Sequence, residues 1–191
     1  MLITACSDND DNSGNGGGDG SEEQILFKNG TEIGNGEQNF YIKENHTLKK
    51  GTYLLKGWVY IEDGATLTIE PGTIIKGDKE TMAALIARRG GKLIAKGTAT
   101  EPIVFTSSQE IGKRKPGDWG GIILCGRAKN NNDINDGMPI EGGPNAKHGG
   151  NNDDDNSGIV SYVRIEFAGY PFATDQEING LTMGSVGRGT Q

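Results

Sequence analysis

The sequence predicts an all-β fold in which short strands wind into a parallel β-helix. Glycine occupies 32 of the 191 positions and is spread along the chain, which favours tight turns between short strands. Leu67 and Leu93 are separated by 26 residues, as are Gly64 and Gly90, and each such unit holds three short strands. Single-glycine corners and Pro71-Gly72 suit bends between strands that continue around a coil, which argues against a meander of hairpins.

Residues 51–191 are expected to form the turns of this coil. Within residues 65–69, Leu67 and Ile69 face one way while Thr66 and Thr68 face the other, which is the alternation of a half-buried strand. Equivalent strands of successive turns should pair in parallel, about 4.8 Å apart. The other strands are predicted at 58–61, 73–76, 85–87, 92–96 and 102–106, with one long strand at 159–169.

Three segments fall outside this regular pattern. Residues 7–24 lack apolar periodicity and predict a flexible, acidic and Gly-rich linker. Residues 25–50 contain Asn29-Gly30 and Asn35-Gly36, which are turn signals, and predict a small N-terminal β cap. Residues 127–157 form an insertion rich in Asn, Asp and Gly.

Cys6 stands between the apolar stub at residues 2–5 and the acidic run that begins at Ser7. This arrangement resembles a bacterial lipoprotein processing site, in which the cysteine receives lipid and becomes the mature N-terminus. Residues 1–6 are therefore expected to be a truncated signal remnant with the lipidation site at Cys6. The acidic run resembles the surface-export signal of Bacteroidetes outer-membrane lipoproteins, which implies a lipid-anchored protein on the cell surface. Cys125 lies in an apolar strand and is expected to be an inert core thiol.

Three strings carry a further resemblance: Gly-Ala-Thr-Leu-Thr-Ile-Glu-Pro-Gly-Thr-Ile-Ile at 64–75, Pro-Gly-Asp-Trp-Gly-Gly-Ile at 116–122, and Tyr-Val-Arg-Ile-Glu-Phe-Ala-Gly at 162–169. Together they resemble a family of Bacteroidetes surface lipoproteins that contain a right-handed parallel β-helix of the pectate-lyase-like type. The resemblance covers roughly residues 50–190 and the N-terminal anchor. Members are usually longer, so the chain is expected to be an N-terminal fragment whose helix is incomplete at the C-terminus.

The leading functional hypothesis is a non-enzymatic binding or adhesion module for an extracellular glycan or other polymer. Aromatic and charged side chains on an outer β surface suit contact with sugars, and the candidates for this role are Trp119, Tyr162, Arg164 and Glu166. The alternatives are packing of the aromatic rings and, for Arg164 and Glu166, a charge ladder between adjacent turns. The formal net charge of −7 argues against a nucleic-acid partner.

The insertion also predicts a calcium site, because Ca²⁺ takes 6–8 oxygen ligands and tolerates irregular loops. The candidate ligands are carboxylate and amide side chains, namely Asp133, Asn135, Asp136, Asp153, Asp154 and Asp155. The sequence at 133–137 partly matches the start of a calcium-binding loop, although it lacks the distal Glu. A solvated surface loop is the alternative reading of this composition.

No residue is assigned to catalysis. His46 and His148 lie far apart in turn-rich segments with no Ser or Cys arranged around them, so both are expected to be surface residues. Two alternatives to the binding module stay open. One is a polysaccharide lyase or hydrolase whose catalytic turns lie beyond Gln191, and the other is a structural stalk.

Overall fold

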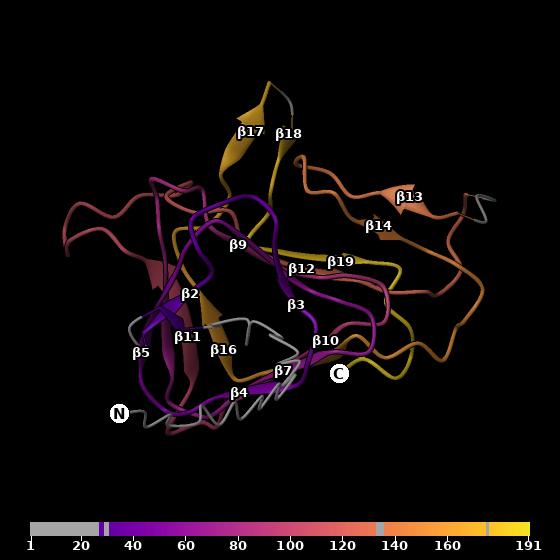
Figure 1. The fold of residues 1–191 in the computed structure, drawn as a ribbon, viewed down its shortest axis with the longest axis horizontal. Coiled ribbons are helices and arrows are strands. Elements are labelled where there is room, and N and C mark those ends of the chain that lie inside the picture. The colour runs from indigo at the N-terminus through magenta and orange to yellow at the C-terminus, as the bar shows by residue number, and fades with distance from the viewer. Residues whose placement is uncertain (1–26, 29–30, 133–135, 175) are drawn as a thin grey trace, which may run out of the picture.

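The computed structural model describes residues 27–28, 31–132, 136–174 and 176–191, and every regular element in these residues is a strand (Figure 1). The chain runs repeatedly through three strands before it returns to its starting side. The coils comprise β2 (Glu32–Ile33), β3 (Phe40–Ile42) and β4 (His46–Leu48); β5 (Thr52–Leu55), β6 (Trp58–Ile61) and β7 (Thr66–Ile69); β8 (Ile74–Gly77), β9 (Ala84–Ala87) and β10 (Lys92–Lys96); β11 (Ile103–Ser107), β12 (Ile122–Cys125) and β15 (Gly158–Ser161); and finally β16 (Val163–Ile165) and β19 (Leu181–Gly184).

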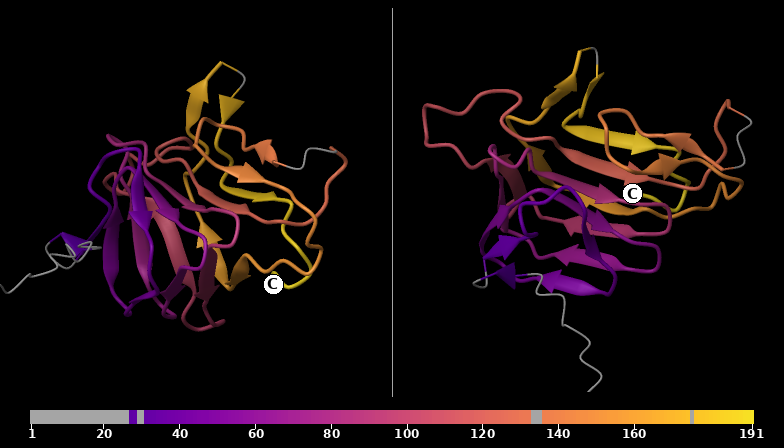
Figure 2. Two further views of the ribbon diagram at one scale, coloured as in Figure 1. Left: turned by 45° about the vertical axis from the view of Figure 1, so that its right-hand side comes forward. Right: turned by 45° about the horizontal axis from the view of Figure 1, so that its top comes forward.

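Corresponding strands of successive coils pair side by side and form three sheets. Sheet 1 has the order β1-β2-β5-β8-β11-β16, where β1 is the short strand Phe27–Lys28 before the first coil. Sheet 2 has the order β19-β12-β9-β6-β3, and sheet 3 the order β15-β10-β7-β4. Every pairing between successive coils is parallel, and Leu67 pairs with Leu93 as the 26-residue spacing predicts. Figure 2 shows the coils stacked in chain order. The predicted parallel β-helix is therefore confirmed.

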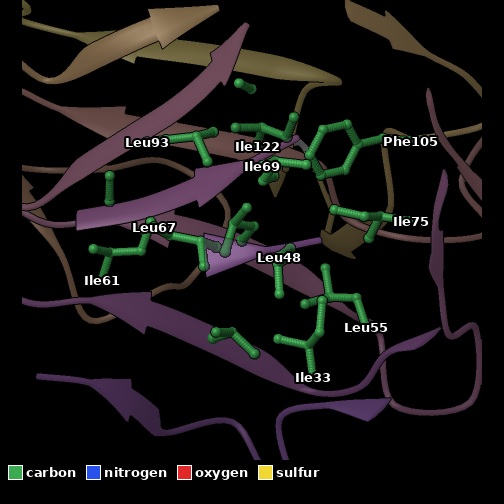
Figure 3. Packing of buried hydrophobic residues seen from close by; sticks show 14 of the residues in the cluster. Ile33, Leu48, Leu55, Ile61, Leu67, Ile69, Ile75, Leu93, Phe105 and Ile122 are labelled. Atoms are coloured by element: carbon green, nitrogen blue, oxygen red, sulfur yellow. The ribbon is translucent and has the colours of Figure 1, made fainter. Parts of the chain in front are cut away.

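The interior of the coil is a continuous stack of apolar side chains. Leu67 and Leu93 are both completely buried, and each occupies the same position in its own coil (Figure 3). Burying one such side chain contributes roughly 1.5–3 kcal/mol to the stability of the fold. A single coil would lack this contribution, because the neighbouring coils are what bury its side chains. Trp119 packs with Phe105 in this core, with ring centroids 6.2 Å apart. Gly77 lies against Trp119, where an added Cβ would stand only 2.5 Å from the indole Cγ.

Residues 25–50 differ from the predicted cap. In this segment, only β1 (Phe27–Lys28) pairs with its neighbour in the antiparallel direction among the described strands, and that neighbour is β2. β2, β3 and β4 pair in parallel with β5, β6 and β7, so residues 32–48 form the first coil of the helix itself. The turn signal Asn35-Gly36 marks a coil corner, since Gly36 adopts a positive φ between β2 and β3, whereas Asn29-Gly30 lies outside the described residues.

The long strand predicted at residues 159–169 is wrong. The chain forms two strands, β15 and β16, and Tyr162 between them has a φ of 51°. This left-handed residue turns the chain from sheet 3 into sheet 1. Phe167 also has a positive φ, of 59°, so it does not extend the inward face of Val163 and Ile165.

The outer face of sheet 2 is covered by two excursions of the chain. One contains the hairpin of β13 (Met138–Pro139) and β14 (Lys147–His148), and the other contains the hairpin of β17 (Pro171–Ala173) and β18 (Gln176–Glu177) (Figure 1). The covered face forms a second apolar cluster, made by Trp58, Tyr60, Ala84, Ile86, Ile123, Cys125, Ile140, Ala146 and Ile178. β6, β9 and β12 are consequently buried on both faces.

The described residues contain no helix with the length and apolar character needed to span a bilayer.

Candidate ligand-binding cleft

A polar cleft lies where the insertion meets the ends of strands β6 and β9 of sheet 2. The turns that follow β6 and β9 supply its walls on the coil side, and the segment that leads into β14 supplies the opposite wall. The cleft has a volume of about 260 Å³. Its lining residues are Glu62, Asp63, Arg88, Arg89, Asn145, Ala146 and Lys147. The coil repeat brings the pairs 62–63 and 88–89 together because they occupy equivalent positions of successive coils.

Beside the cleft, aromatic rings hold one of its arginines in place. Tyr41 and Tyr60 stack with centroids 5.4 Å apart, and the guanidinium of Arg88 lies 5.4 Å from the Tyr60 centroid. The Tyr60 hydroxyl accepts a hydrogen bond from the Asn145 backbone N–H at 3.1 Å. Burial raises the pKa of Tyr60, so the hydroxyl remains protonated near neutral pH. The cation–π contacts and this hydrogen bond fix Arg88 and the insertion relative to each other.

Charged side chains around the cleft form ion pairs and hydrogen bonds that join one coil turn to the next and the coil turns to the insertion. Arg88 donates to Glu62 Oε1 at 2.9 Å and to the Asn145 carbonyl oxygen at 2.7 Å. Arg127 pairs with Asp63 and also donates to the Arg89 carbonyl oxygen at 3.1 Å. These interactions satisfy part of each carboxylate and guanidinium while leaving further donors and acceptors at the cleft surface.

Two cations of the cleft are held by the insertion. Lys147 pairs with Asp136, and this hydrogen bond and charge lower the pKa of the Asp136 carboxyl. Arg89 donates to the Gly149 carbonyl oxygen at 3.0 Å, and it forms an ion pair with no carboxylate of the described residues. The cleft therefore presents both cationic donors and anionic acceptors to a polar ligand.

Trp119, a predicted ligand-binding residue, lies in the core. Its side chain is completely buried, its ring packs with Phe105, and its Nε1–H donates to the Glu166 carbonyl oxygen at 2.8 Å. No face of the ring is open to a sugar. Trp119 therefore takes the packing role that was the alternative in the sequence analysis.

The other three predicted ligand-binding residues lie at a different corner of the coil from the cleft. Tyr162 is 61% exposed at the corner between sheets 3 and 1. Arg164 is exposed on β16 and pairs with Glu166, whose Oε2 accepts a hydrogen bond from Thr106 at 2.9 Å. The ion pair lies within one turn, and the contact of Glu166 with the neighbouring strand is to the neutral Thr106, so these residues do not form the charge ladder between adjacent turns that was the alternative.

The four predicted calcium ligands that the structure describes have other partners and do not form a group. Asp133 and Asn135 lie outside the described residues, and Asp136 pairs with Lys147. Asp153 accepts a hydrogen bond from the Lys129 N–H, Asp154 pairs with Arg188, and Asp155 accepts from the Ser157 hydroxyl. Among the described residues, no group of three or more His, Cys, Asp or Glu side chains is placed to hold a metal ion. Calcium binding stays a prediction, and a rise in melting temperature with added Ca²⁺ would support it.

Of the two cysteines, the structure describes Cys125. Cys125 is completely buried in sheet 2, and this burial raises the pKa of its thiol to about 12. A thiol that stays protonated is a poor nucleophile, in keeping with a core role. Cys6 lies outside the described residues.

His148 has a neighbour that was not expected from the sequence. It is partly exposed, but its Nδ1 lies 2.8 Å from Ser185 Oγ, where no serine was expected beside it. Sequence alone gives little signal for this pair, because 37 residues separate the two side chains. Stacking of β19 on β12 brings Ser185 beneath the insertion, next to the Lys147 end of the cleft.

The stacked parallel coils and the polar cleft beside a covered sheet define a β-helical solenoid with a candidate ligand site. The family model described as the pectate-lyase like beta helix domain matches residues 40–191, which is most of the chain. The chain therefore belongs to this family. Comparisons with curated proteins and with solved structures found no match.

Proposed function

We propose that the protein is a binding module for an extracellular glycan or a related polar polymer, and that the cleft beside sheet 2 is its binding site. Membership of the pectate-lyase like beta helix family fits a carbohydrate-related function in general. The observation that carries the proposal is the cleft itself, which is lined mainly by hydrogen-bonding side chains from two coil turns and from the insertion.

The chemistry of the cleft matches that of sugar hydroxyl groups. Each hydroxyl both donates and accepts, and the cleft offers carboxylate acceptors in Glu62 and Asp63 beside the donors of Arg89 and Lys147. Its volume of about 260 Å³ is near the lower end of ligand pockets, which span roughly 300–1,000 Å³. The cleft would therefore hold a small unit of the polymer, while neighbouring units extend over the surface of the coil.

Glycan-array binding by the wild-type protein and two cleft variants tests this proposal. Asp63→Ala and Lys147→Ala each remove one hydrogen-bonding group, and each is expected to weaken binding roughly 10- to 150-fold, since a hydrogen bond to a charged group is worth roughly 1.5–3 kcal/mol. Lys113→Ala is the matched control, because Lys113 is an exposed lysine that does not line the cleft.

Three outcomes would count against the proposal. If wild type and all three variants bound with equal affinity, the glycan would bind somewhere other than the cleft. Shortening of the polymer during the assay would favour the lyase or hydrolase alternative. An array without any bound glycan, together with no polymer cleavage, would favour the structural stalk.

The proposal includes a location at the outer surface of the outer membrane, with a lipid anchor at Cys6. The apolar and small residues before Cys6 and the acidic run after it support this assignment. Two or more acyl chains, at about 0.8 kcal/mol per buried CH₂, would hold the protein stably on the membrane. The partners are then the outer-membrane lipid and a polysaccharide.

A further inference from the structure

Ser185 and His148 form a hydrogen-bonded pair at the end of the cleft. The distance from Ser185 Oγ to His148 Nδ1 is 2.8 Å, which lies within the range of a nucleophile and its general base. His148 belongs to β14, directly after the cleft residue Lys147, and both side chains of the pair are partly exposed. Neither residue lines the cleft itself, so the partial exposure of the pair is the access that a substrate group would use.

A third side chain determines which way the hydroxyl points. Asn130 Oδ1 accepts a hydrogen bond from the Asn132 N–H at 2.8 Å, so the Nδ2 group of Asn130 is the one that faces Ser185. Nδ2 can only donate, and it does so to Ser185 Oγ at 3.1 Å. The Ser185 O–H is then free to donate to Nδ1 of His148.

His148 is neutral, as a base must be. Burial, together with the positive charge of Arg89, lowers the pKa of His148 below its ordinary value of 6.5. At neutral pH the ring therefore carries one proton, and the hydrogen bond from Ser185 places that proton on Nε2. Nδ1 keeps a lone pair directed at the serine hydroxyl.

The backbone around the pair includes one strained residue and two glycines. Ser185 has a φ of 46°, which is unusual for a residue other than glycine and is a kind of strain found at functional sites. A Cβ at Gly184 would stand 2.6 Å from Cγ of His148, and one at Gly149 would stand 2.6 Å from Nδ2 of Asn130. These two glycines make room for the imidazole ring and for the Asn130 amide.

We propose that Ser185 and His148 act as nucleophile and general base in the hydrolysis of carboxylic esters. Ser185 Oγ attacks the ester carbonyl carbon while His148 Nδ1 takes the hydroxyl proton. The C–O bond to the alcohol then breaks, and the alcohol leaves with that proton. Water attacks the acyl-serine with His148 again taking a proton, and Ser185 recovers its hydrogen as the carboxylic acid departs.

The position of the pair points to acyl groups carried on sugar hydroxyls. The cleft beside His148 offers the hydrogen-bonding surface that would hold the alcohol part of such an ester. Arg89 donates to the Gly149 carbonyl oxygen, one residue after His148, so a positive charge stands close to this segment. This activity adds to polymer binding and does not depend on it, because a small ester needs only the pair itself.

Labelling with a fluorophosphonate probe and hydrolysis of 4-nitrophenyl acetate test the proposal on the whole chain. The wild-type protein should carry the probe on Ser185, as located by mass spectrometry, and should hydrolyse the ester. Ser185→Gly should abolish labelling and lower the hydrolysis rate at least roughly 100-fold, and His148→Asn should do the same because the base is lost. Ser161→Ala, a serine variant on β15, is the control and should behave as wild type.

Ser185→Gly also separates catalysis from structure. Glycine adopts a positive φ without strain, which offsets the loss of the hydrogen bonds to His148 and Asn130, so the melting temperature of this variant should stay within a few degrees (roughly 5 °C) of wild type. A wild-type protein that takes no label and hydrolyses no ester would overturn the proposal, as would a Ser185→Gly variant that keeps its activity. Because Ser185 does not line the cleft, loss of activity with intact glycan binding would leave the proposed function standing, and the reverse result would remove only that function.

Discussion

Asp118 is a buried carboxylate that holds the end of the long loop between β11 and β12. It accepts hydrogen bonds from the Ser107 hydroxyl at 2.7 Å and from the Lys115 N–H at 2.9 Å, and Lys79 lies 3.1 Å away. Burial would raise the pKa of Asp118, but these hydrogen bonds and the lysine charge outweigh it and hold the pKa below the usual value of 3.8. The ionised form therefore stabilises the fold.

The Asp118→Asn variant should lose this stabilisation at neutral pH. Its free energy of unfolding, measured by urea denaturation at pH 7, should be lower than wild type by about 1–3 kcal/mol. Because the native pKa is depressed, the ionic contribution is complete above the unfolded-state pKa, near 4, and is lost as the pH falls through the lower native value.

The difference between wild type and Asp118→Asn should accordingly shrink below about pH 4. Glu110→Gln is the control, since Glu110 is exposed and should change the stability little at either pH. A difference that stays constant with pH would show that the carboxylate charge is not what stabilises the loop.

At the level of elements, the repeat was predictable and the corners were not. The 26-residue spacing gave the register between β7 and β10, because apolar residues must recur wherever a coil faces its own interior. The corner at Tyr162 escaped prediction, since a left-handed conformation in a residue other than glycine has no reliable sequence signal. The single long strand expected there is two strands in the structure.

The insertion shows a second limit of the sequence. Its Asn, Asp and Gly content suggested a solvated loop or a calcium site, but Ile140 and Ala146 are buried against sheet 2. Isolated apolar residues without periodicity do not reveal what they cover. The Ser185–His148 pair and the cleft depend on this same docking, so neither could be recognised before the coils were stacked.

Ile140→Ala tests whether the insertion is docked on the sheet. Ile140 is only 7% exposed, and removing its buried methyl groups should lower the free energy of unfolding by about 2 kcal/mol. Ile111→Ala is the same substitution at a residue that is 90% exposed, and it should change the stability by less than about 0.5 kcal/mol. Equal effects of the two variants in denaturant unfolding would contradict a docked insertion.

For the whole molecule, the formal charge is concentrated at one end of the sequence. Six of the 26 acidic residues and none of the 19 basic residues lie in residues 1–26, so residues 27–191 carry a formal charge of −1 out of the total of −7. The repulsion of anionic partners expected from the whole chain therefore arises from the segment that follows Cys6. The β-helix itself is nearly neutral.

The lipid anchor is tested on the protein expressed with a complete signal peptide in a bacterium that processes lipoproteins. Radiolabelled palmitate should be incorporated into the wild-type protein and not into Cys6→Ala, which should leave the membrane fraction. Cys125→Ala is the control, because its thiol is completely buried, and it should be labelled as well as wild type. Incorporation into Cys6→Ala would disprove the anchor.

The insertion also changes how the coils depend on one another. In a simple solenoid each repeat touches only the next one, so the two ends can unravel independently. Here the Asn145 N–H bonds Tyr60 across 85 residues of sequence, and the Asn145 carbonyl oxygen accepts from Arg88 across 57. These clasps tie the second and third coils to a segment that leaves the fourth. The first coil and the last coil lie outside these contacts, but unravelling of the second, third or fourth coil must break them. The insertion therefore couples these three coils into one cooperative unit instead of a row of nearly independent ones.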